Sequence, residues 1–449
     1  MLHPAGRMTT LFTNACLLPC TADMPVIDRG WLLVTGEVIS ALGGGAAPEV
    51  PGAEVVDLGG DVLMPGMVNP HSHLAMSLFR GLGEDVDDRL YRYILPLERE
   101  FVAPDMVRAG TGLSALELIQ GGVTTVADMY YFETVVAEVL DSAGLRGVVG
   151  QTLADFDPPD HRDFDEGFAR VEELMDRYRD HPRITPGIAP HAPYSTGMAV
   201  MERVAAWAEA NPGYPVQIHL AETGPETDWA AGLGLSPVQA VAQAGLLRPG
   251  LVAAHCLHVS PDDIALMAAS GVGVAHNARA NGKGGRGIAP VTAMRAAGIP
   301  VGISTDGPMS GNTLDLFAQF APVSMFQKIA GGSRKPMPAV EVIRMATIEG
   351  ARVLGLHRHI GSLEPGKQAD LIRVSMAAPR LHPVYDIYAT LVFSAMAPDV
   401  ADVMVAGRWL MRGRQVLSVD PAKARADAAQ VAGRFRGRMA EIDRALRGR

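Results

Sequence analysis

Eight short apolar segments recur along the middle of this chain, and a stretch with helical periodicity separates each from the next. Each segment is apolar for about five residues, which is typical of a strand covered on both sides. Alternating strand and helix units predict parallel strands with right-handed crossovers, and eight such units close a barrel. We therefore predict an α/β fold, a (β/α)8 TIM barrel. The segments span residues 64–73, 122–129, 146–153, 183–193, 214–222, 250–258, 271–279 and 299–307.

The intervening stretches carry helix start and stop signals. Proline opens residues 237–247 and 261–271, and glycine closes the second of these stretches. An open doubly wound sheet is the structural alternative. It would require a glycine-rich phosphate turn after its first strand, and the sequence has none there.

The flanks of the predicted barrel contain short strands and turns. Residues 8–63 and 361–419 share this texture, so we expect them to pair as a small composite β-sandwich domain. The expected division is residues 1–63, the catalytic barrel 64–360, and residues 361–419. The last stretch, 420–449, is predicted as one arginine-rich helix whose charged face is solvated or packed on a partner subunit.

Composition limits the partners and the compartment. The chain has 39 Lys and Arg against 49 Asp and Glu, a net charge of −10. Nucleic-acid polymers and anionic membranes both require a basic surface, so neither is expected as a partner. Three cysteines (Cys16, Cys20 and Cys256) are too few for a disulfide framework, and they favour a reducing, cytoplasmic location. We expect neither a signal peptide nor a membrane span, because no apolar run approaches ~18 residues.

Polar or ionisable residues stand at the end of each apolar segment. Barrel enzymes place their chemistry at the carboxyl ends of the strands. We therefore expect these side chains to gather at one mouth of the barrel. They are His71, His73, Asp128, Gln151, His191, His219, Glu222, His255, His276 and Asp306.

His71-Ser72-His73 is the sharpest local signal. Residues i and i+2 of a strand point to the same side, so both imidazoles are expected to face the lumen. His219 would supply a third nitrogen. Asp306 would supply a carboxylate, since the first and eighth strands are neighbours in a closed barrel. Any one of these residues could be an ordinary buried polar group; together they favour one divalent metal, with zinc expected and Fe²⁺ the alternative.

Three more strand-end side chains are candidates for the chemistry. Glu222 lies three residues after His219, where a carboxylate could carry a proton to the substrate. His255 could hydrogen-bond the attacking water, and His191 could donate to a ring atom. A surface glutamate and a buried structural histidine are the alternatives. The segment around His191 has no lysine that could bridge two metals, so one metal is expected. The zinc-deaminase signature H-x-E with P-C-x-x-C is absent.

A glycine-rich segment follows the seventh predicted strand. Residues 281–287 read Asn-Gly-Lys-Gly-Gly-Arg-Gly, without the spacing of a phosphate-binding loop. A solvated loop is the favoured interpretation. The alternative is that Arg279, Lys283 and Arg286 receive an anionic tail of the substrate.

With these residues in view, the chain resembles the amidohydrolase superfamily, in the branch that holds S-adenosylhomocysteine/5′-methylthioadenosine deaminases and triazine hydrolases. The likeness extends over nearly the whole length, and its motifs occur in the family's order. They are PGMVNPHSHLAMSLFRGLGED, ADMYYF, APHAPYS, HLAET, AHCLH, STDG, GSLEPGKQADL and VADVMVAGRW.

The resemblance implies a role for each candidate. His71, His73, His219 and Asp306 would bind a single divalent metal, and Asp306 would also take the proton from the attacking water. His255 would orient that water, Glu222 would protonate the ring nitrogen, and His191 would contact the heterocycle. Glu98 falls where the nucleoside deaminases keep a carboxylate for the ribose hydroxyls, whereas triazine chlorohydrolases tend to have an amide.

Two of the chain's departures from the family pattern concern the seventh strand and the contact with the substrate's tail. The strand-seven motif loses its usual proline and serine and reads His276-Asn277-Ala278-Arg279-Ala280-Asn281. The arginine that receives the homocysteine carboxylate in the S-adenosylhomocysteine enzymes aligns with Gln151. Arg162 is the sequence's substitute candidate for that contact.

The resemblance implies hydrolytic deamination of a small heterocyclic substrate, an adenosine-type nucleoside first, by a homodimer or homotetramer. The alternative is deamination or dechlorination of a triazine, pterin or guanine-like base at the same site. A non-enzymatic relative that keeps the barrel for assembly is disfavoured, because such a chain would be expected to have lost ligands.

Overall fold

The computed structural model describes residues 8–86 and 88–447, and its larger body is an eight-stranded parallel sheet whose strands follow chain order. The first and last strands also contact each other, so the sheet is a nearly closed barrel. This confirms the predicted (β/α)8 fold and excludes the open sheet. The strands are β6 (Met67–Asn69), β7 (Val123–Tyr130), β8 (Arg146–Leu153), β9 (Ile184–Pro190), β10 (Val216–Leu220), β11 (Leu251–His255), β12 (Gly273–His276) and β13 (Val301–Ile303).

One amide side chain holds the seam of the barrel. Asn69, at the end of β6, donates from Nδ2 to Thr305 Oγ1 (2.8 Å) and accepts at Oδ1 from the Thr305 backbone N–H (3.2 Å). Both residues are fully buried, so these bonds form away from competing water. These two hydrogen bonds hold the segment after β6 beside the segment after β13.

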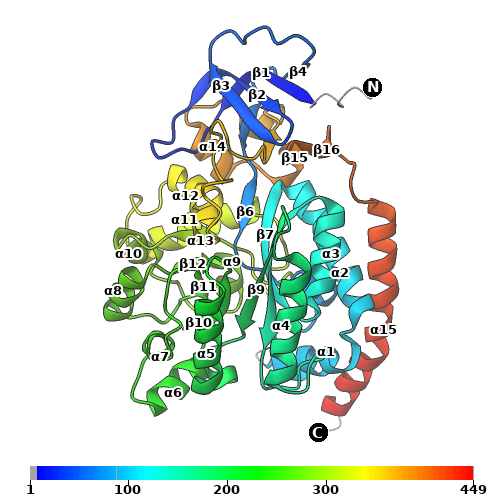
Figure 1. The fold of residues 1–449 in the computed structure, drawn as a ribbon, viewed down its shortest axis with the longest axis vertical. Coiled ribbons are helices and arrows are strands. Elements are labelled where there is room, and N and C mark those ends of the chain that lie inside the picture. Colours follow the sequence, from blue (N-terminus) through cyan, green and yellow to red (C-terminus); the bar gives the residue numbers. More distant parts are fainter. Residues whose placement is uncertain (1–7, 87, 448–449) are drawn as a thin grey trace.

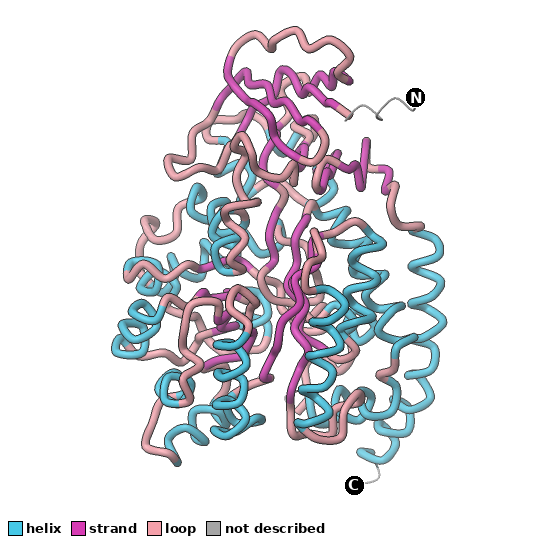
Figure 2. The backbone as a smooth tube through the Cα atoms, viewed as in Figure 1, coloured by secondary structure: helices cyan, strands magenta, loops and turns pink. Residues whose placement is uncertain are grey.

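Helices cover the outside of the barrel, with the strands inside (Figure 2). Their ends follow the expected chemistry: Ser236 and Ser260 form capping boxes before proline, and Gly122, Gly144 and Gly271 end helices in the left-handed conformation. The helices up to the sixth strand are η1 (Leu74–Phe79), η2 (Leu90–Ile94), α1 (Leu95–Phe101), α2 (Pro104–Gly121), α3 (Glu133–Ala143), α4 (Phe164–Tyr178), α5 (Pro193–Ala210), α6 (Gly224–Gly232) and α7 (Pro237–Gln243). Those that follow are α8 (Pro261–Ser270), α9 (Ala278–Lys283), α10 (Val291–Ala296), α11 (Phe317–Ala330), α12 (Ala339–Ala346), α13 (Ile348–Val353), η3 (Pro379–Leu381), α14 (Ile387–Phe393), η4 (Ala397–Asp399) and α15 (Pro421–Arg447).

The two flanks form one nine-stranded, mostly antiparallel sheet at the top of Figure 1. The pairing of β5 with β14 joins the N-terminal flank to the C-terminal one, which confirms the composite domain. The chain enters the barrel through Gly66, between β5 and β6; the division at 63, 360 and 419 otherwise stays a prediction. The strands are β1 (Thr9–Leu17), β2 (Ile27–Thr35), β3 (Val38–Gly44), β4 (Glu54–Asp57), β5 (Val62–Pro65), β14 (Leu371–Val374), β15 (Val400–Val405), β16 (Arg408–Arg412) and β17 (Gln415–Val416).

The C-terminal helix α15 packs on its own barrel, along α2 and down to α1, at the right of Figure 1. Phe435 is 2% exposed, with its ring centroid 5.2 Å from those of both Phe79 and Phe101. Tyr93 donates from Oη to Asp443 (2.7 Å). The charged face is exposed at Arg434 and Arg436, as the sequence suggested, while the aromatic contacts place the other face against η1 and α1.

Phe435→Ala is therefore expected to lower the free energy of unfolding by about 3–5 kcal/mol, as for other large-to-small changes of a buried phenylalanine. Chemical denaturation measures this change. The control is Arg436→Ala, one residue along the same helix and exposed, which should stay within about 0.5 kcal/mol of the parent. Equal midpoints for the two variants would contradict the packing described here.

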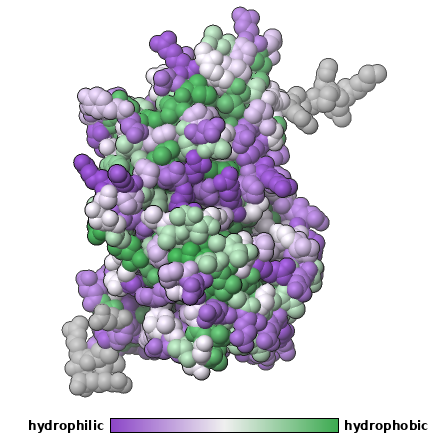
Figure 3. Space-filling view, turned by 90° about the vertical axis from the view of Figure 1, so that its left-hand side faces the viewer, coloured by the Kyte–Doolittle hydropathy of each residue, from purple (hydrophilic) through white to green (hydrophobic). Residues whose placement is uncertain are grey.

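The surface of the molecule mixes hydrophilic and hydrophobic residues on the face shown in Figure 3. Within residues 8–86 and 88–447, no helix combines the length and the apolar character that a bilayer span requires.

Candidate active site

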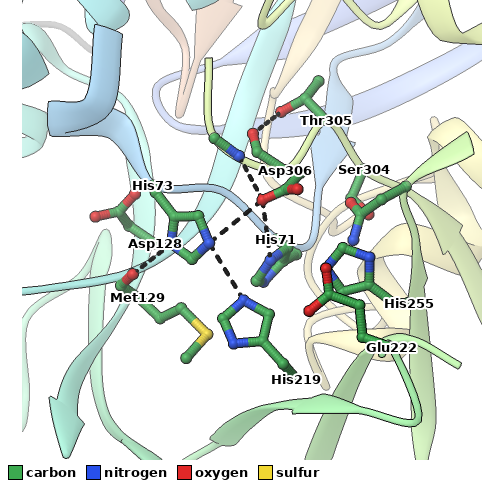
Figure 4. Close-up of polar contacts among 12 residues, drawn as sticks. His71, His73, Asp128, Met129, His219, Glu222, His255, Ser304, Thr305 and Asp306 are labelled. Atoms are coloured by element: carbon green, nitrogen blue, oxygen red, sulfur yellow. Dashed lines mark hydrogen bonds and ion pairs between the residues drawn. The ribbon is translucent and has the colours of Figure 1, made fainter. Parts of the chain in front are cut away.

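Four side chains from three strand ends converge at one point of the barrel (Figure 4). His71 and His73 follow β6, His219 lies in β10, and Asp306 follows β13. The Nε2 atoms of His73 and His219 are 3.3 Å apart, and Asp306 Oδ1 lies 3.3 Å from His73 Nε2 and 3.7 Å from His71 Nε2. The structure thus brings together all four residues that the sequence proposed as metal ligands.

The spacing and the hydrogen bonding of this cluster fit a divalent metal. Ligand atoms about 2.0–2.1 Å from a tetrahedral zinc lie roughly 3.3 Å from one another, close to the separations of 3.3–3.7 Å found here. The Nδ1 atoms of His73 and His219 lie 2.6 Å from Met129 O and 2.8 Å from His191 O. A carbonyl oxygen only accepts, so each Nδ1 carries its hydrogen and each Nε2 lone pair is free to bind a metal. His71 Nε2 is buried and has no hydrogen-bond partner among the described residues.

Burial keeps His71 and His219 in the neutral form that binds metal, whereas the pKa of His73 is raised because the neighbouring Asp306 outweighs the effect of burial. Burial lowers the pKa of His71 to about 4, and burial with the neighbouring imidazoles holds the pKa of His219 well below its usual range. Burial alone would raise the pKa of Asp306, but its contacts with the imidazoles of His71 and His73 hold it well below its ordinary value. Neutral imidazoles and an ionised carboxylate are the forms that bind metal.

The same strand ends are conformationally strained. Ala221, His255 and Asp306 have φ values of 51°, 73° and 60°, a region that costs about 1–3 kcal/mol for a residue other than glycine. The Gly307 N–H donates to Asp306 Oδ1 (2.7 Å), which fixes the carboxylate. Strained backbone at the ends of three strands of one barrel is typical of a functional site.

Glu222 and His255 lie beside the metal-ligand cluster. His255 Nε2 is 3.6 Å from Glu222 Oε1, and His255 Nδ1 is 2.8 Å from Asn281 Oδ1. The amide oxygen of Asn281 accepts from Nδ1, so Nε2 faces the cluster as an acceptor. Glu222 also forms an ion pair with Arg286 of the glycine-rich segment.

Glu226 is a residue that sequence reasoning missed. Its Oε1 accepts from the Ala221 N–H (2.7 Å) and its Oε2 from the Glu222 N–H (2.8 Å), and it is 1% exposed. Burial raises its pKa to about 7. The pattern Thr223-x-x-Glu226 at the start of α6 was the available signal, because this spacing is typical of a helix cap.

Glu226→Gln is expected to lower kcat by about 10- to 100-fold, because one amide oxygen cannot accept from both N–H groups and Glu222 shifts. Bound metal should be unchanged, since Glu226 contacts none of the four ligands. Steady-state kinetics with metal analysis checks both expectations. Asp228→Asn, an exposed change in the same helix, is the matched control and should keep parental turnover.

A cavity of about 750 Å³ opens over these residues. Its lining includes His73, His219, His255, Asp306 and Glu222, and also Glu98 and His191.

Glu98 and His191 are each held by one neighbour. Tyr130 Oη donates to Glu98 Oε1 (2.6 Å), and burial raises the pKa of Glu98 to about 7. His191 Nδ1 lies 2.8 Å from Ser195 Oγ, and burial lowers its pKa to about 3. Both side chains are thus presented to the cavity where the sequence expected substrate contacts.

Two predicted substrate contacts do not reach the cavity, which corrects the sequence interpretation. Gln151 is buried behind the wall, where its Nε2 donates to Asp160 Oδ2 (2.9 Å); its neighbour Thr152 lines the cavity instead. Arg162 is exposed and pairs with Glu166 one helical turn away. Because alternate residues of a strand face opposite sides, Gln151 and Thr152 cannot both point inward.

Two further strand-end residues stay outside the cavity lining. His276 is buried, with both ring nitrogens lacking a hydrogen-bond partner within the described part of the chain. Asp128 Oδ1 accepts from the Leu74 N–H (2.5 Å) and so anchors the backbone directly after His73. Asp128 therefore has a positioning role.

Comparison with known proteins agrees with this geometry. Residues 62–410 match the amidohydrolase family. The 5-methylthioadenosine/S-adenosylhomocysteine deaminase of Syntrophobacter fumaroxidans is 37% identical over 421 residues, which is 93% of this chain and 96% of the relative. The enzyme of the same name from Desulforudis audaxviator is 38% identical over 440 residues, 95% of this chain and 99% of the relative.

Solved structures extend the likeness to the fold. An adenosine deaminase from Xanthomonas campestris with bound zinc is 34% identical, with a TM-score of 0.92 and coverage of 97% of this chain and 100% of the other. An atrazine chlorohydrolase from Arthrobacter aurescens complexed with zinc has a TM-score of 0.87 at 21% identity, covering 94% and 100%, and so shares the fold. The chain belongs to the amidohydrolase family.

Proposed function

We propose that this protein is a metal-dependent hydrolytic deaminase of adenosine-type nucleosides. The observation that carries the proposal is that one cavity is lined both by His73, His219 and Asp306 of the metal-ligand cluster, with Glu222, and by Glu98. Relatives at 37% and 38% identity are named as deaminases of such nucleosides, and the zinc-bound structural relative as an adenosine deaminase. We expect a homo-oligomer in the cytoplasm.

Zinc is the metal we propose for the cluster, since three imidazoles and one carboxylate suit it and both structural relatives hold it. When bound, the metal supplies a Lewis acid that makes water a nucleophile near neutral pH. His71, His73, His219 and Asp306 would hold it through Nε2 and carboxylate oxygen atoms.

The chain's own residues handle the protons. Asp306 accepts the proton of the attacking water on its carboxylate, and His255 Nε2 accepts a hydrogen bond that orients that water. Glu222 gives a proton to the ring nitrogen beside the amino-bearing carbon. A C–O bond forms at that carbon, its C–N bond to the amino group breaks, and ammonia leaves after it receives the proton that Asp306 holds; the remaining hydroxyl proton returns to Glu222 as the carbonyl product forms.

Glu98 predicts a pH dependence. Its carboxylate would accept from the ribose hydroxyls, and this acceptor is strongest when ionised. Because its pKa is raised to about 7, kcat/KM should rise with pH through about 7 and then level off. In Glu98→Gln, kcat/KM should be lower, and the rise of kcat/KM with pH around 7 should be absent. An unchanged rise in the variant would show that another group titrates there.

The proposed reaction is tested by ammonia release from a panel of adenosine, 5′-methylthioadenosine, S-adenosylhomocysteine, guanine, a pterin and a triazine. The proposal expects the three nucleosides to be turned over with the highest kcat/KM. Preference for the free base, the pterin or the triazine, or release of chloride from a chlorotriazine, would instead support the alternative substrate class.

A further inference from the structure

Three cations line the mouth of the cavity, and two of them have fixed partners. Lys283 Nζ lies 2.6 Å from Glu84 Oε2 and 3.1 Å from Asn312 Oδ1. Arg89 donates to Met309 O (3.1 Å) and lies 3.7 Å from Glu84. Arg286 is the remaining cation of the cavity lining.

Arg286 is placed so that it can change partners. Its side chain pairs with Glu222 and is 40% exposed. It lies between Gly285 (φ 64°) and Gly287 (φ 113°), around which space is open, and its own N–H is anchored to Asn281 O (3.0 Å). In the proposed reaction Glu222 must face the substrate ring. The Arg286 guanidinium would then lose its partner and could bind an anionic group of the substrate.

Asp155 supplies the opposite charge at the same mouth. It follows β8, lines the cavity, is exposed, and has no hydrogen-bond or ion-pair partner for its carboxylate among the described residues. Burial raises the pKa of Tyr194 to about 12; Asp155 adds to this shift, and Arg286 opposes it. The carboxylate and the guanidinium therefore both lie near one tyrosine of the cavity wall.

Arg286 and Asp155 together offer one positive and one negative charge, which complement the two charges of a zwitterion. S-adenosylhomocysteine carries an α-carboxylate and an α-ammonium on its tail, whereas 5′-methylthioadenosine ends in an uncharged methyl group. We propose that Arg286 and Asp155 select the thioether nucleoside with the amino-acid tail, with Arg286 binding the carboxylate and Asp155 the ammonium. This inference rests on the proposed deaminase function. It places recognition of the tail at Arg286, beyond the seventh strand of the barrel, and at Asp155, beyond the third, instead of at Gln151 and Arg162.

The test compares kcat/KM for S-adenosylhomocysteine with kcat/KM for 5′-methylthioadenosine in the metal-loaded enzyme. In Arg286→Gln the ratio of the two should fall by about 10- to 100-fold, the loss expected for a charge-assisted hydrogen bond. Asp155→Asn should lower the same ratio, and Arg286→Lys should restore part of it. Using the ratio cancels any effect that loss of the Arg286–Glu222 pair has on both substrates.

Two controls separate this role from a general effect of charge. Lys283→Gln removes a cation from the same segment, but it should change both substrates equally because Lys283 is held by Glu84. Arg162→Gln should leave the ratio at its parental value. An unchanged ratio in Arg286→Gln, or an equal fall in Lys283→Gln, would overturn the proposal.

The parental enzyme itself distinguishes the two levels of inference. If it deaminates 5′-methylthioadenosine but not S-adenosylhomocysteine, the tail-binding proposal fails and the proposed function stands. If it deaminates no nucleoside, the proposed function fails and the tail-binding proposal fails with it.

Discussion

His73→Ala is expected to abolish metal binding and turnover together. His73 Nε2 lies 3.3 Å from both Asp306 Oδ1 and His219 Nε2, so its imidazole contacts two of the other three proposed ligands. Removing it leaves three donors and loses several kcal/mol of Lewis-acid assistance, a fall in kcat on the order of 10⁴-fold. Metal analysis of the purified variant, with ammonia release as the assay, measures both effects.

The control for this variant is His359→Ala, an exposed histidine outside the cavity lining, which should keep its metal and its turnover. Added zinc should restore little activity to His73→Ala at concentrations that saturate the parent. A variant at position 73 that is fully metal-loaded and fully active would contradict the ligand assignment.

Glu222→Gln is expected to lower kcat by about 10²- to 10⁴-fold while the metal content stays at the parental level. Glutamine keeps the size of the side chain and its approach to His255, but it cannot donate a carboxyl proton to the substrate ring. Loss of turnover without loss of metal is therefore the signature of a proton-transfer role.

Glu202→Gln, an exposed glutamate of α5, is the matched control and should behave as the parent. Two results would argue against the role of Glu222. One is full turnover in Glu222→Gln. The other is loss of metal in that variant, which would place the carboxylate among the ligands.

The barrel and the ligand cluster could be predicted because strong, simple physics determines them. Apolar runs between amphipathic helices can be buried only as parallel strands, and the ends of such strands meet at one mouth. His71, His73, His219 and Asp306 needed only that topology to converge. The composite sheet could be predicted from two flanks that both consist of short strands and turns and lie on either side of one barrel.

Side chains whose position depends on local direction were harder to predict. Gln151 stands near the end of β8, but the alternation of the strand turns it toward Asp160 and leaves Thr152 facing the cavity. Arg162 forms an ion pair with Glu166, four residues along the chain, and this exposed pair holds its side chain outside the cavity. Comparison with the family pattern indicated where these residues lie in the chain, but not which way their side chains point.

The remaining surprises come from contacts across long sequence separations. Glu222 and Arg286 pair across two different βα loops, and Tyr93 reaches Asp443 on the last helix. An arginine-rich helix such as α15 shows a polar pattern in sequence, and only the position of Phe79 and Phe101 explains why Phe435 is buried. Local periodicity carries no signal for such pairs.

The most direct test is a titration of the purified protein with chelator and then with zinc, following metal content and ammonia release from 5′-methylthioadenosine in the same samples. The account predicts that turnover falls in proportion to metal removed, vanishes in the metal-free protein, and returns fully at one zinc ion per chain. Undiminished turnover in metal-free protein, or a requirement for two ions per chain, would contradict it.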